Sequence, residues 1–305
     1  MSFAADHTVE QLADKMRGAG VRFRSGPFIV RLRSNVLSFV ETWASCYPGL
    51  QLLPDDEIAH FRIQIRRKSF FSRPMRPQAQ FFLEDRAPFE PYPLDHAFPM
   101  FEWGLNWCIG SMAHQFLMLH SATLEKHGRA LVMPAQPGSG KSTLCAALLG
   151  KGWRLLSDEF GIVDMTTHEL VPLPRAAPMK NESIEVIRQY CPNLRLGPIF
   201  HKTRKGTVSH VFPPDDALAR QSERARPALI LFPRYEVGSP TQISDQPRSV
   251  ALTRMVNNSF NYLVSGEPGF AALCDIVRNA HCRQLVYSDL DEAIARIEQE
   301  ITQPL

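Results

Sequence analysis

Residues 135–143 read Ala135-Gln-Pro-Gly-Ser-Gly140-Lys141-Ser142-Thr143. A loop that wraps its backbone N–H groups around phosphate oxygens has no room for bulky side chains, and Gly138 and Gly140 meet that need. The flanks agree, because residues 129–134 form an apolar run typical of a buried strand and residues 142–149 favour a helix. Strand, loop and helix in this order point a helix N-terminus at a bound anion. The stretch therefore predicts a phosphate-binding loop (P-loop).

The loop side chains predict how a nucleotide would be held. Lys141 is expected to reach the β- and γ-phosphates, and the Ser142 hydroxyl is expected to bind Mg²⁺. A chance turn rich in Gly and Ser is the alternative interpretation, and the two correct flanks argue against it. The predicted nucleotide-binding residues are Gln136, Pro137, Gly138, Ser139, Gly140, Lys141, Ser142 and Thr143.

Composition narrows the class of protein. The chain has 305 residues, enough for one large domain or two ordinary ones, and its apolar (44%) and charged (21%) fractions are those of a globular protein. A net charge of +3 is too small to predict nucleic-acid binding. The longest apolar stretch, residues 100–119, contains Glu102 and Asn106, so we expect a buried helix and no membrane span.

The N-terminal residues and the spacing of the cysteines predict the cellular compartment. The first seven residues lack the basic and apolar segments of a signal peptide. The six cysteines are scattered without a Cys-x-x-Cys pair, which is typical of reduced core thiols. A cytoplasmic protein is therefore expected, with no membrane partner.

The coarse order of elements predicts an α/β protein in two parts. Residues 1–95 read as a small α+β module, with strands near 28–33, 60–66 and 80–83 and helices near 1–16 and 36–46. The strand at 60–66 should turn Arg62, Gln64 and Arg66 outward, and the Pro-rich stretch 86–99 reads as a linker or a surface crossing. Residues 96–305 contain the P-loop and every other chemical motif. Strands are expected there at 118–124, 129–134, 153–156, 160–164, 207–212, 228–232 and 282–287, and helices at 98–115, 142–149, 181–190, 249–258, 269–279 and 290–301. Phe101, Trp103 and Trp107 lie near helical spacing, which predicts core or interdomain packing.

Two adjacent acids follow the P-loop helix. In common P-loop ATPases the Mg²⁺-binding acid ends a later apolar strand, but the best such run here, residues 228–233, ends in Pro and is followed by Arg234. Asp158 and Glu159 instead end a strand that follows the helix at once, seventeen residues after Lys141. That position can bring both acids to the edge of the sheet where the P-loop lies. One acid can hold Mg²⁺ while the other accepts a proton from an attacking hydroxyl.

His120 completes a pattern twenty-one residues before Lys141. Leu119-His120, a strand, Pro-Gly-Ser-Gly-Lys-Ser and then Leu-Leu-Ser-Asp-Glu resemble the core of the HPr kinase/phosphorylase family, over roughly residues 115–165. That resemblance implies an α/β P-loop kinase core similar to HPr kinase and phosphoenolpyruvate carboxykinase. It implies that Asp158 is the catalytic acid/base, His120 its hydrogen-bonding neighbour and Glu159 a metal ligand. The family usually has Asp-Asp, so Glu159 is a departure that remains compatible with Mg²⁺.

The later part of the chain departs further from HPr kinase. The Arg-Gly-rich signature of that family is not evident, and in its place stand residues 175–182 and 202–210. These look like the branch called HprK-related kinases, whose substrate is not HPr. The N-terminal module does not match that of HPr kinase either. Lys180, Arg204 and Lys205 are the candidate cations for a phosphate clamp.

The sequence thus predicts an enzyme, a serine-type kinase that uses ATP and Mg²⁺ to phosphorylate a hydroxyl on a protein, peptide or small molecule. An ATP-binding regulatory or assembly subunit without phosphoryl transfer is the alternative. A phosphorylase or carboxykinase working with pyrophosphate or a phospho-acid is a third, weaker interpretation. The acceptor, the choice of ATP over GTP and homo-oligomer formation stay open.

Overall fold

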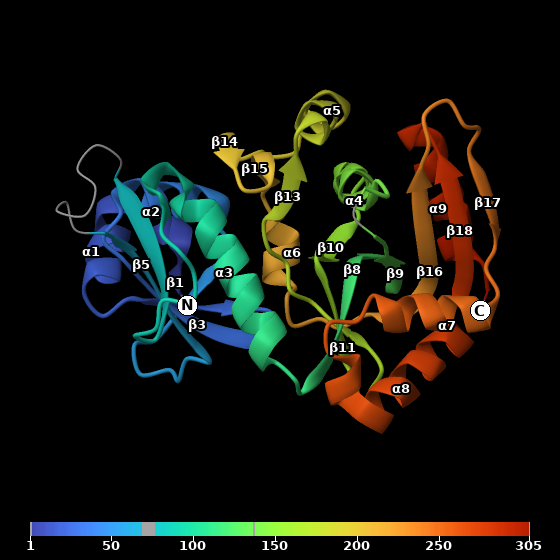
Figure 1. Cartoon of the computed structure of the whole chain (residues 1–305), viewed down its shortest axis with the longest axis horizontal. Coiled ribbons are helices and arrows are strands. Elements are labelled where there is room, and N and C mark those ends of the chain that lie inside the picture. Colours follow the sequence, from blue (N-terminus) through green and yellow to red (C-terminus); the bar gives the residue numbers. More distant parts are fainter. Residues whose placement is uncertain (1, 69–76, 137, 305) are drawn as a thin grey trace.

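The protein is a mixed α/β structure with two large sheets and one small one (Figure 1). The computed structural model describes residues 2–68, 77–136 and 138–304. In Figure 1 the first sheet and its helices lie on the left, and the second sheet with the later helices lies on the right. The expected α/β class is confirmed at this level.

The first sheet has seven strands. A hydrogen-bonded cap fixes the start of its first helix, α1 (Val9–Arg17). α1 begins after Thr8, whose hydroxyl accepts from the Gln11 N–H while the Gln11 side chain accepts from the Thr8 N–H, a capping box. The sheet order is β1 (Ser2–Phe3), β4 (Gln51–Leu53), β2 (Val21–Ser25), β3 (Phe28–Ser34), β5 (Phe61–Arg67), β6 (Gln78–Leu83) and β7 (Tyr92–Pro93). The helices α1 (Val9–Arg17), α2 (Leu37–Cys46) and α3 (Ala97–Met112) share its core.

The polar face of this sheet is more basic than the sequence pattern suggests. Arg62 and Arg66 point outward as expected, with Gln64 between them partly exposed. In the sheet, Arg31 pairs with Arg22 on one side and with Arg62 on the other. Three arginines therefore lie side by side, in an arrangement that repels across the strands.

Helix α3 connects two halves of the protein. The first half contains the seven-stranded sheet, and the second half contains the other two sheets. The helix contacts β5, β6 and α2 of the first half, and the same core includes Phe160 and Leu173 from the second half. The predicted linker at 86–99 contains β7, a 3-10 turn at Leu94–His96 and the first turn of α3. A division at residues 95 and 96 stays a prediction, because α3 packs with the residues before it.

The second sheet is mixed, and alternate residues of its strands face two different cores. Leu229 and Leu231 of β16 face the core with α4 and α9, whereas Ile230 and Phe232 face the core with α7 and α8. The order is β12 (Leu170–Val171), β11 (Phe160–Asp164), β8 (Phe116–Lys126), β9 (Arg129–Pro134), β16 (Arg226–Tyr235), β18 (His281–Tyr287) and β17 (Gln242–Asp245). The helices are α4 (Lys141–Gly150), α7 (Arg248–Asn257), α8 (Tyr262–Asn279) and α9 (Leu290–Thr302).

Strand β8 has eleven residues and has two successive partners on one side. β10 (Arg154–Ser157) pairs with its C-terminal part and β11 with its N-terminal part, both antiparallel. The register of β10 on β8 shifts between Leu155 and Ser157, and the chain then leaves the sheet at Asp158 and Glu159, a break called here the bulge. A third sheet of β13 (Ala177–Lys180), β15 (Gly206–Val211) and β14 (Phe200–Thr203) stands beside α4, followed along the chain by α6 (Asp215–Ala219). α5 (Glu182–Tyr190) follows β13 directly.

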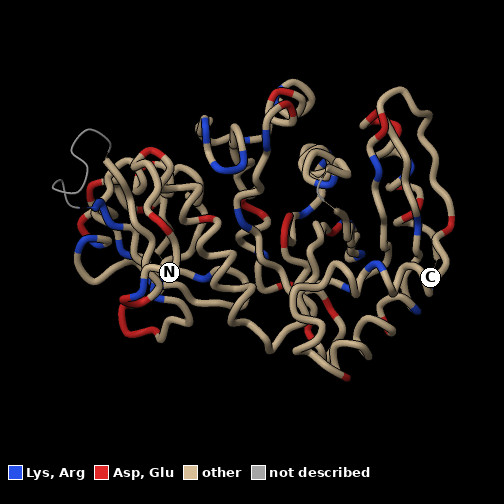
Figure 2. Tube along the Cα trace, viewed as in Figure 1, with Lys and Arg blue, Asp and Glu red and all other residues tan. Residues whose placement is uncertain are grey.

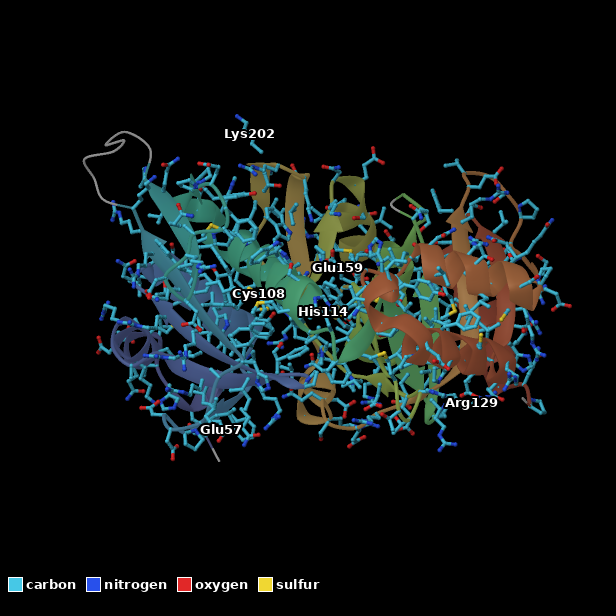
Figure 3. The ribbon with its side chains drawn as sticks, turned by 60° about the horizontal axis from the view of Figure 1, so that its bottom comes forward. Glu57, Cys108, His114, Arg129, Glu159 and Lys202 are labelled. Atoms are coloured by element: carbon cyan, nitrogen blue, oxygen red, sulfur yellow. The ribbon has the colours of Figure 1, made fainter. Side chains whose placement is uncertain are left out.

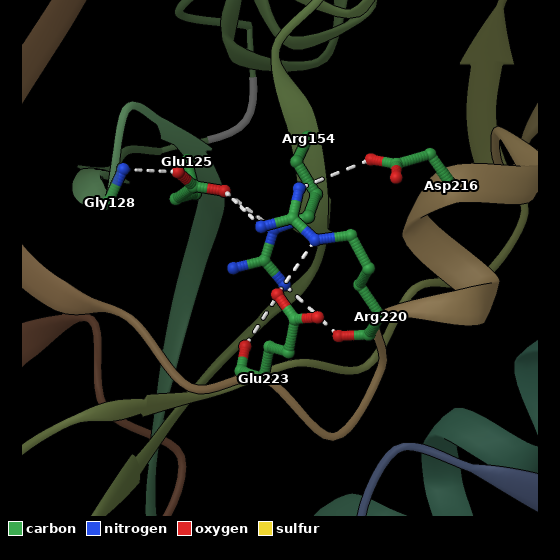
Figure 4. Close-up of polar contacts among 6 residues, drawn as sticks. All are labelled: Glu125, Gly128, Arg154, Asp216, Arg220 and Glu223. Atoms are coloured by element: carbon green, nitrogen blue, oxygen red, sulfur yellow. Dashed lines mark hydrogen bonds and ion pairs between the residues drawn. The ribbon is translucent and has the colours of Figure 1, made fainter.

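A buried ion pair ties β8 to β10 at the end away from the bulge (Figure 4). Arg154 Nε donates to Glu125 Oε2 over 2.6 Å, and both side chains are about 5% exposed or less. The second Glu125 oxygen accepts from the Gly128 N–H at 2.5 Å, and Arg154 also donates to the backbone carbonyls of Arg220 and Glu223. The pair is therefore well hydrogen-bonded on both sides.

All six cysteines lie in the described ranges and are free thiols. Within those ranges, none of the helices combines the length and the apolar character needed to cross a bilayer.

Candidate functional site

The glycine-rich loop sits between β9 and α4, as its flanks predict. Gly138 and Gly140 both have φ of 86°, a conformation that favours glycine. A Cβ at Gly140 would lie 2.5 Å from the Tyr287 hydroxyl, whereas a Cβ at Gly138 would meet nothing within 4 Å. The carbonyl of Gly140 accepts from the Leu144 N–H and the Tyr287 hydroxyl, at 2.9 and 3.3 Å. Gly140 thus serves both the turn and the close approach to β18.

The first turn of α4 points at the acidic bulge. Lys141 Nζ donates to the backbone carbonyl of Asp158 over 2.7 Å, and Ser142 Oγ lies 3.1 Å from Asp158 Oδ2. Asp158 is 6% exposed, and within the described residues its Oδ1 has no hydrogen-bond partner. An unpartnered buried carboxylate oxygen beside a lysine and a hydroxyl leaves capacity for a ligand.

The bulge is held by Ser157. Its hydroxyl accepts from the backbone N–H groups of Glu159 and Phe160, at 3.4 and 3.0 Å. These bonds replace sheet pairing where the strand breaks, so the two acids project from a fixed backbone.

One cavity of about 670 Å³, the loop cavity, brings nearly all the predicted residues together. Its lining includes Gln136, Gly138, Ser139, Gly140, Lys141, Ser142, Thr143, Asp158, Glu159, His120, Lys180 and Lys205. Two predicted residues are not among them. Pro137 lies outside the described residues, and the Arg204 guanidinium instead lies 4.8 Å from the centre of the Tyr92 ring.

Two of the three candidate cations face the loop from the small sheet. Lys180 ends β13, and Lys205 lies in the β14–β15 hairpin, which carries a group of basic residues (Figure 2). Partial burial lowers the pKa of Lys205, and Lys180 lowers it further, while Glu159 opposes the shift. Pro178 and Ser183 also line the cavity, and the sequence pattern did not single them out.

His120 lies in the same cavity on β8. Its backbone N–H donates to the Asn258 carbonyl over 2.6 Å, and its ring packs 5.5 Å from the Phe260 ring. Burial lowers the pKa of His120, and the charge of Lys141 acts in the same direction. A neutral imidazole is therefore expected at neutral pH.

Glu159 is anchored from the first half of the protein. Asn106 Nδ2 donates to Glu159 Oε2 over 3.0 Å, and Arg175 donates to the Asn106 side-chain oxygen. Arg175 also pairs with Glu102 at 2.6 Å, with both side chains buried, and Glu102 accepts from the Tyr47 hydroxyl at 2.8 Å. Figure 3 shows Glu159 near the middle of the molecule, close to the helix α3 that carries Cys108.

This chain of contacts, from Tyr47 through Glu102, Arg175 and Asn106 to Glu159, was not predicted from the sequence. The available signal was the presence of Glu102 and Asn106 inside an otherwise apolar helix, because buried polar groups need partners.

The donors fit a magnesium ion. Ser142 and the two acids offer the hard oxygen ligands that Mg²⁺ prefers, and Mg²⁺ in phosphate-transfer sites takes further ligands from phosphates and water. Within the described ranges no group of three or more His, Cys, Asp and Glu side chains forms a cage for a metal.

No protein-family model matches the chain, and no curated protein matches it.

Proposed function

We propose that the protein is a kinase that transfers a phosphoryl group from Mg²⁺-ATP to a hydroxyl, with a core like that of HPr kinase. The observation that carries the proposal is the loop cavity, where the glycine-rich loop, Lys141 and both acids converge. A phosphate-binding loop with carboxylates on its far side is the arrangement that phosphoryl transfer needs.

The chain would contribute positioning and charge. Loop N–H groups and Lys141 stabilise the oxygens of the transferred group, and Lys180 and Lys205 offset charge from the opposite wall. Bound Mg²⁺-ATP supplies the phosphoryl group and neutralises its charge. The acceptor oxygen bonds to the γ-phosphorus, the bond from that phosphorus to the bridging oxygen breaks, and the acceptor proton passes to a carboxylate.

Two assignments of the acids compete. The resemblance to HPr kinase makes Asp158 the proton acceptor and Glu159 the metal ligand, with His120 beside Asp158. The 3.1 Å contact between Ser142 Oγ and Asp158 favours the reverse, because Ser142 is the expected metal-binding hydroxyl. The proposal of a kinase holds under either assignment.

The test begins with nucleotide binding. Mg²⁺-ATP at ~100 times its dissociation constant should stabilise the protein by about 2.7 kcal/mol. Lys141→Ala should remove most of this thermal shift, whereas Lys15→Ala on the exposed side of α1 should keep it. An equal shift in Lys141→Ala would place the nucleotide elsewhere.

Phosphoryl transfer is then measured with γ-labelled ATP and a panel of hydroxyl acceptors from a cell extract. The variant that removes the proton acceptor should lose transfer and keep ATP affinity, and the variant that removes the metal ligand should need more Mg²⁺. Asp158→Asn and Glu159→Gln therefore identify the two roles. A wild-type protein that binds Mg²⁺-ATP and labels no hydroxyl would instead be the ATP-binding regulatory subunit.

A further inference from the structure

A second cavity adjoins the loop cavity, and four of its nine lining residues are aromatic. It measures about 330 Å³ and lies between α3 and the segment before α8. Trp103 and Trp107 come from α3, Phe160 begins β11, and Phe260 precedes α8. We call it the aromatic cavity. Its size is within the range that small ligands or single side chains occupy.

The two cavities share residues. Glu159 and Lys205 line both of them. A group held in the aromatic cavity therefore lies next to Glu159, an acid of the candidate site.

One wall of the aromatic cavity is fixed to the second sheet. The Phe260 N–H donates to the Met118 carbonyl over 2.9 Å, and Ser259 forms a β-bridge with Leu119. Asn261 Oδ1 accepts from the Met118 N–H at 2.9 Å. The Phe260 ring packs 4.9 Å from that of Phe160. Phe260 is nevertheless 48% exposed, so this backbone holds a large apolar ring in contact with solvent.

The other wall belongs to the first half. Trp107 is 41% exposed, and this differs from the packing role that its helical spacing predicts. Its ring packs edge-on against Phe89 at 5.2 Å, which holds it in place without covering it. Lys205 Nζ lies 5.1 Å from the centre of the Trp103 ring. The buried Trp103 Nε1 has no hydrogen-bond partner among the described residues.

Two exposed apolar side chains follow Phe260 closely in the chain. Leu263 and Val264, just after Phe260 in the chain, are 92% and 66% exposed. Exposed apolar side chains near an aromatic pocket are typical of sites that bind another polypeptide, where one anchor side chain enters the pocket. A free small metabolite would need the pocket alone.

We propose that the aromatic cavity binds an aromatic or large aliphatic side chain of a polypeptide acceptor, and so presents a neighbouring serine hydroxyl at Glu159. This inference rests on the proposed kinase function. The anchor would lie close to the serine in sequence, since the two cavities share Glu159 and Lys205 and an extended chain advances ~3.3 Å per residue. Acceptor specificity would then come from α3 and Phe260, and phosphate chemistry from the loop.

The experiment uses the full chain and a serine-centred peptide library in which one flanking position at a time is fixed. One arm measures label transferred from γ-labelled ATP. The other arm measures which peptides the protein retains with Mg²⁺ and a non-hydrolysable ATP analogue. We expect an aromatic or large aliphatic residue at one position to raise both signals roughly tenfold over alanine, equivalent to about 1.4 kcal/mol.

Two variants act on the cavity from different directions. Trp107→Ala removes an anchor ring, and Ser111→Phe fills the cavity from an exposed position that lines it. Both should abolish the preference and keep the thermal shift with Mg²⁺-ATP, which also shows that they fold. Val237→Ala, at a residue 83% exposed and outside the cavity lining, is the matched control and should change neither signal.

The outcomes separate the two proposals. Retention with the expected preference but no label would support the cavity and refute the kinase function. Label without any apolar preference, or a preference that survives in both variants, would overturn the cavity and leave the kinase function standing. Label found only in low-molecular-weight compounds would overturn a polypeptide acceptor, and so would the absence of selective retention.

Discussion

The side-chain amide of Asn106 donates a hydrogen bond to Glu159 Oε2 across 3.0 Å, so that a helix packed on the first sheet holds an acid of the candidate site. Arg175 fixes the amide in turn by donating to its oxygen. The orientation of Glu159 therefore depends on packing between the two halves.

Asn106→Ala should weaken the response to Mg²⁺ if Glu159 is a metal ligand. Loss of a residue that orients a ligand typically lowers metal affinity by about 10- to 100-fold. The Mg²⁺ concentration for half-maximal transfer should rise accordingly, while the binding of ATP without metal should stay the same. Met112→Ala, at an exposed residue of the same helix that lines neither cavity, is the control. An unchanged Mg²⁺ requirement would show that Asn106 has only a structural role.

Gly140→Ala should damage nucleotide binding more than Gly138→Ala. Both positions have a φ that costs alanine about 1–2 kcal/mol, but only at Gly140 would the new Cβ meet the Tyr287 hydroxyl, at 2.5 Å. Calorimetric titration with Mg²⁺-ATP should show the larger loss of affinity for Gly140→Ala. Adding Tyr287→Phe removes the nearest atom and should restore part of that loss. Equal losses in the two single variants would contradict this view of the loop.

Glu125→Ala should strongly destabilise the fold. It leaves Arg154 buried without its partner, and breaking such a pair costs about 3–5 kcal/mol. Glu125→Leu combined with Arg154→Met should be much less harmful, because both charges leave together. Urea unfolding at neutral pH measures the difference between the variants.

The same pair should make stability fall in acid. Burial works to raise the pKa of Glu125, but hydrogen bonds from Arg154 and the Gly128 N–H outweigh it and lower the pKa below its usual value. The stabilisation is present above the pKa of the unfolded chain and is lost as the pH falls through the lower folded pKa. The double variant should lack this part of the acid dependence. Identical acid curves for wild type and double variant would refute the assignment.

Arg62→Thr should raise stability at low salt. Arg62 lies opposite Arg31, which also faces Arg22, and like charges across strands are unfavourable by roughly 0.2–1 kcal/mol. The ion pair that Arg62 makes with Glu84 spans 3.6 Å at the surface and offsets little of this. The gain should shrink at high salt as screening grows. Arg66→Thr, opposite Gln80, serves as the control in thermal melts.

Much of the second half was predictable because its motifs are local. The strand, loop and helix around residues 129–150 and the strand before Asp158 were read from apolar runs and glycines, and the structure has them. The placement of Asp158, Glu159 and His120 around one cavity also agrees with the spacing of the motifs. Their chemical roles stay predictions.

The contacts between distant segments could not be read from the sequence. β2 alternates Val, Arg, Phe and Arg as a strand should and was not predicted, and β4, β13 and β14 are too short to give a clear period. Arg204 and Lys205 are neighbours with equal claims to a phosphate clamp in the sequence. Only the hairpin geometry separates them, since it turns Arg204 over Tyr92 and Lys205 toward the cavity. The exposure of Trp107 likewise depends on what packs against α3.

Strands β10 and β11 pair with one continuous strand, β8, and the two acids lie in the interruption between them. An extra residue there would slide β11 by one position along β8 and exchange the side chains that it presents to the cores on its two faces. The hairpin between β8 and β9 has no such restriction, because its length affects no later register within the site. Relatives of this chain should therefore tolerate a change of length near residues 127–128 better than a change of length within residues 154–164. Selection that keeps the spacing of the two acids thus also constrains the length of β10 and β11 on either side of them.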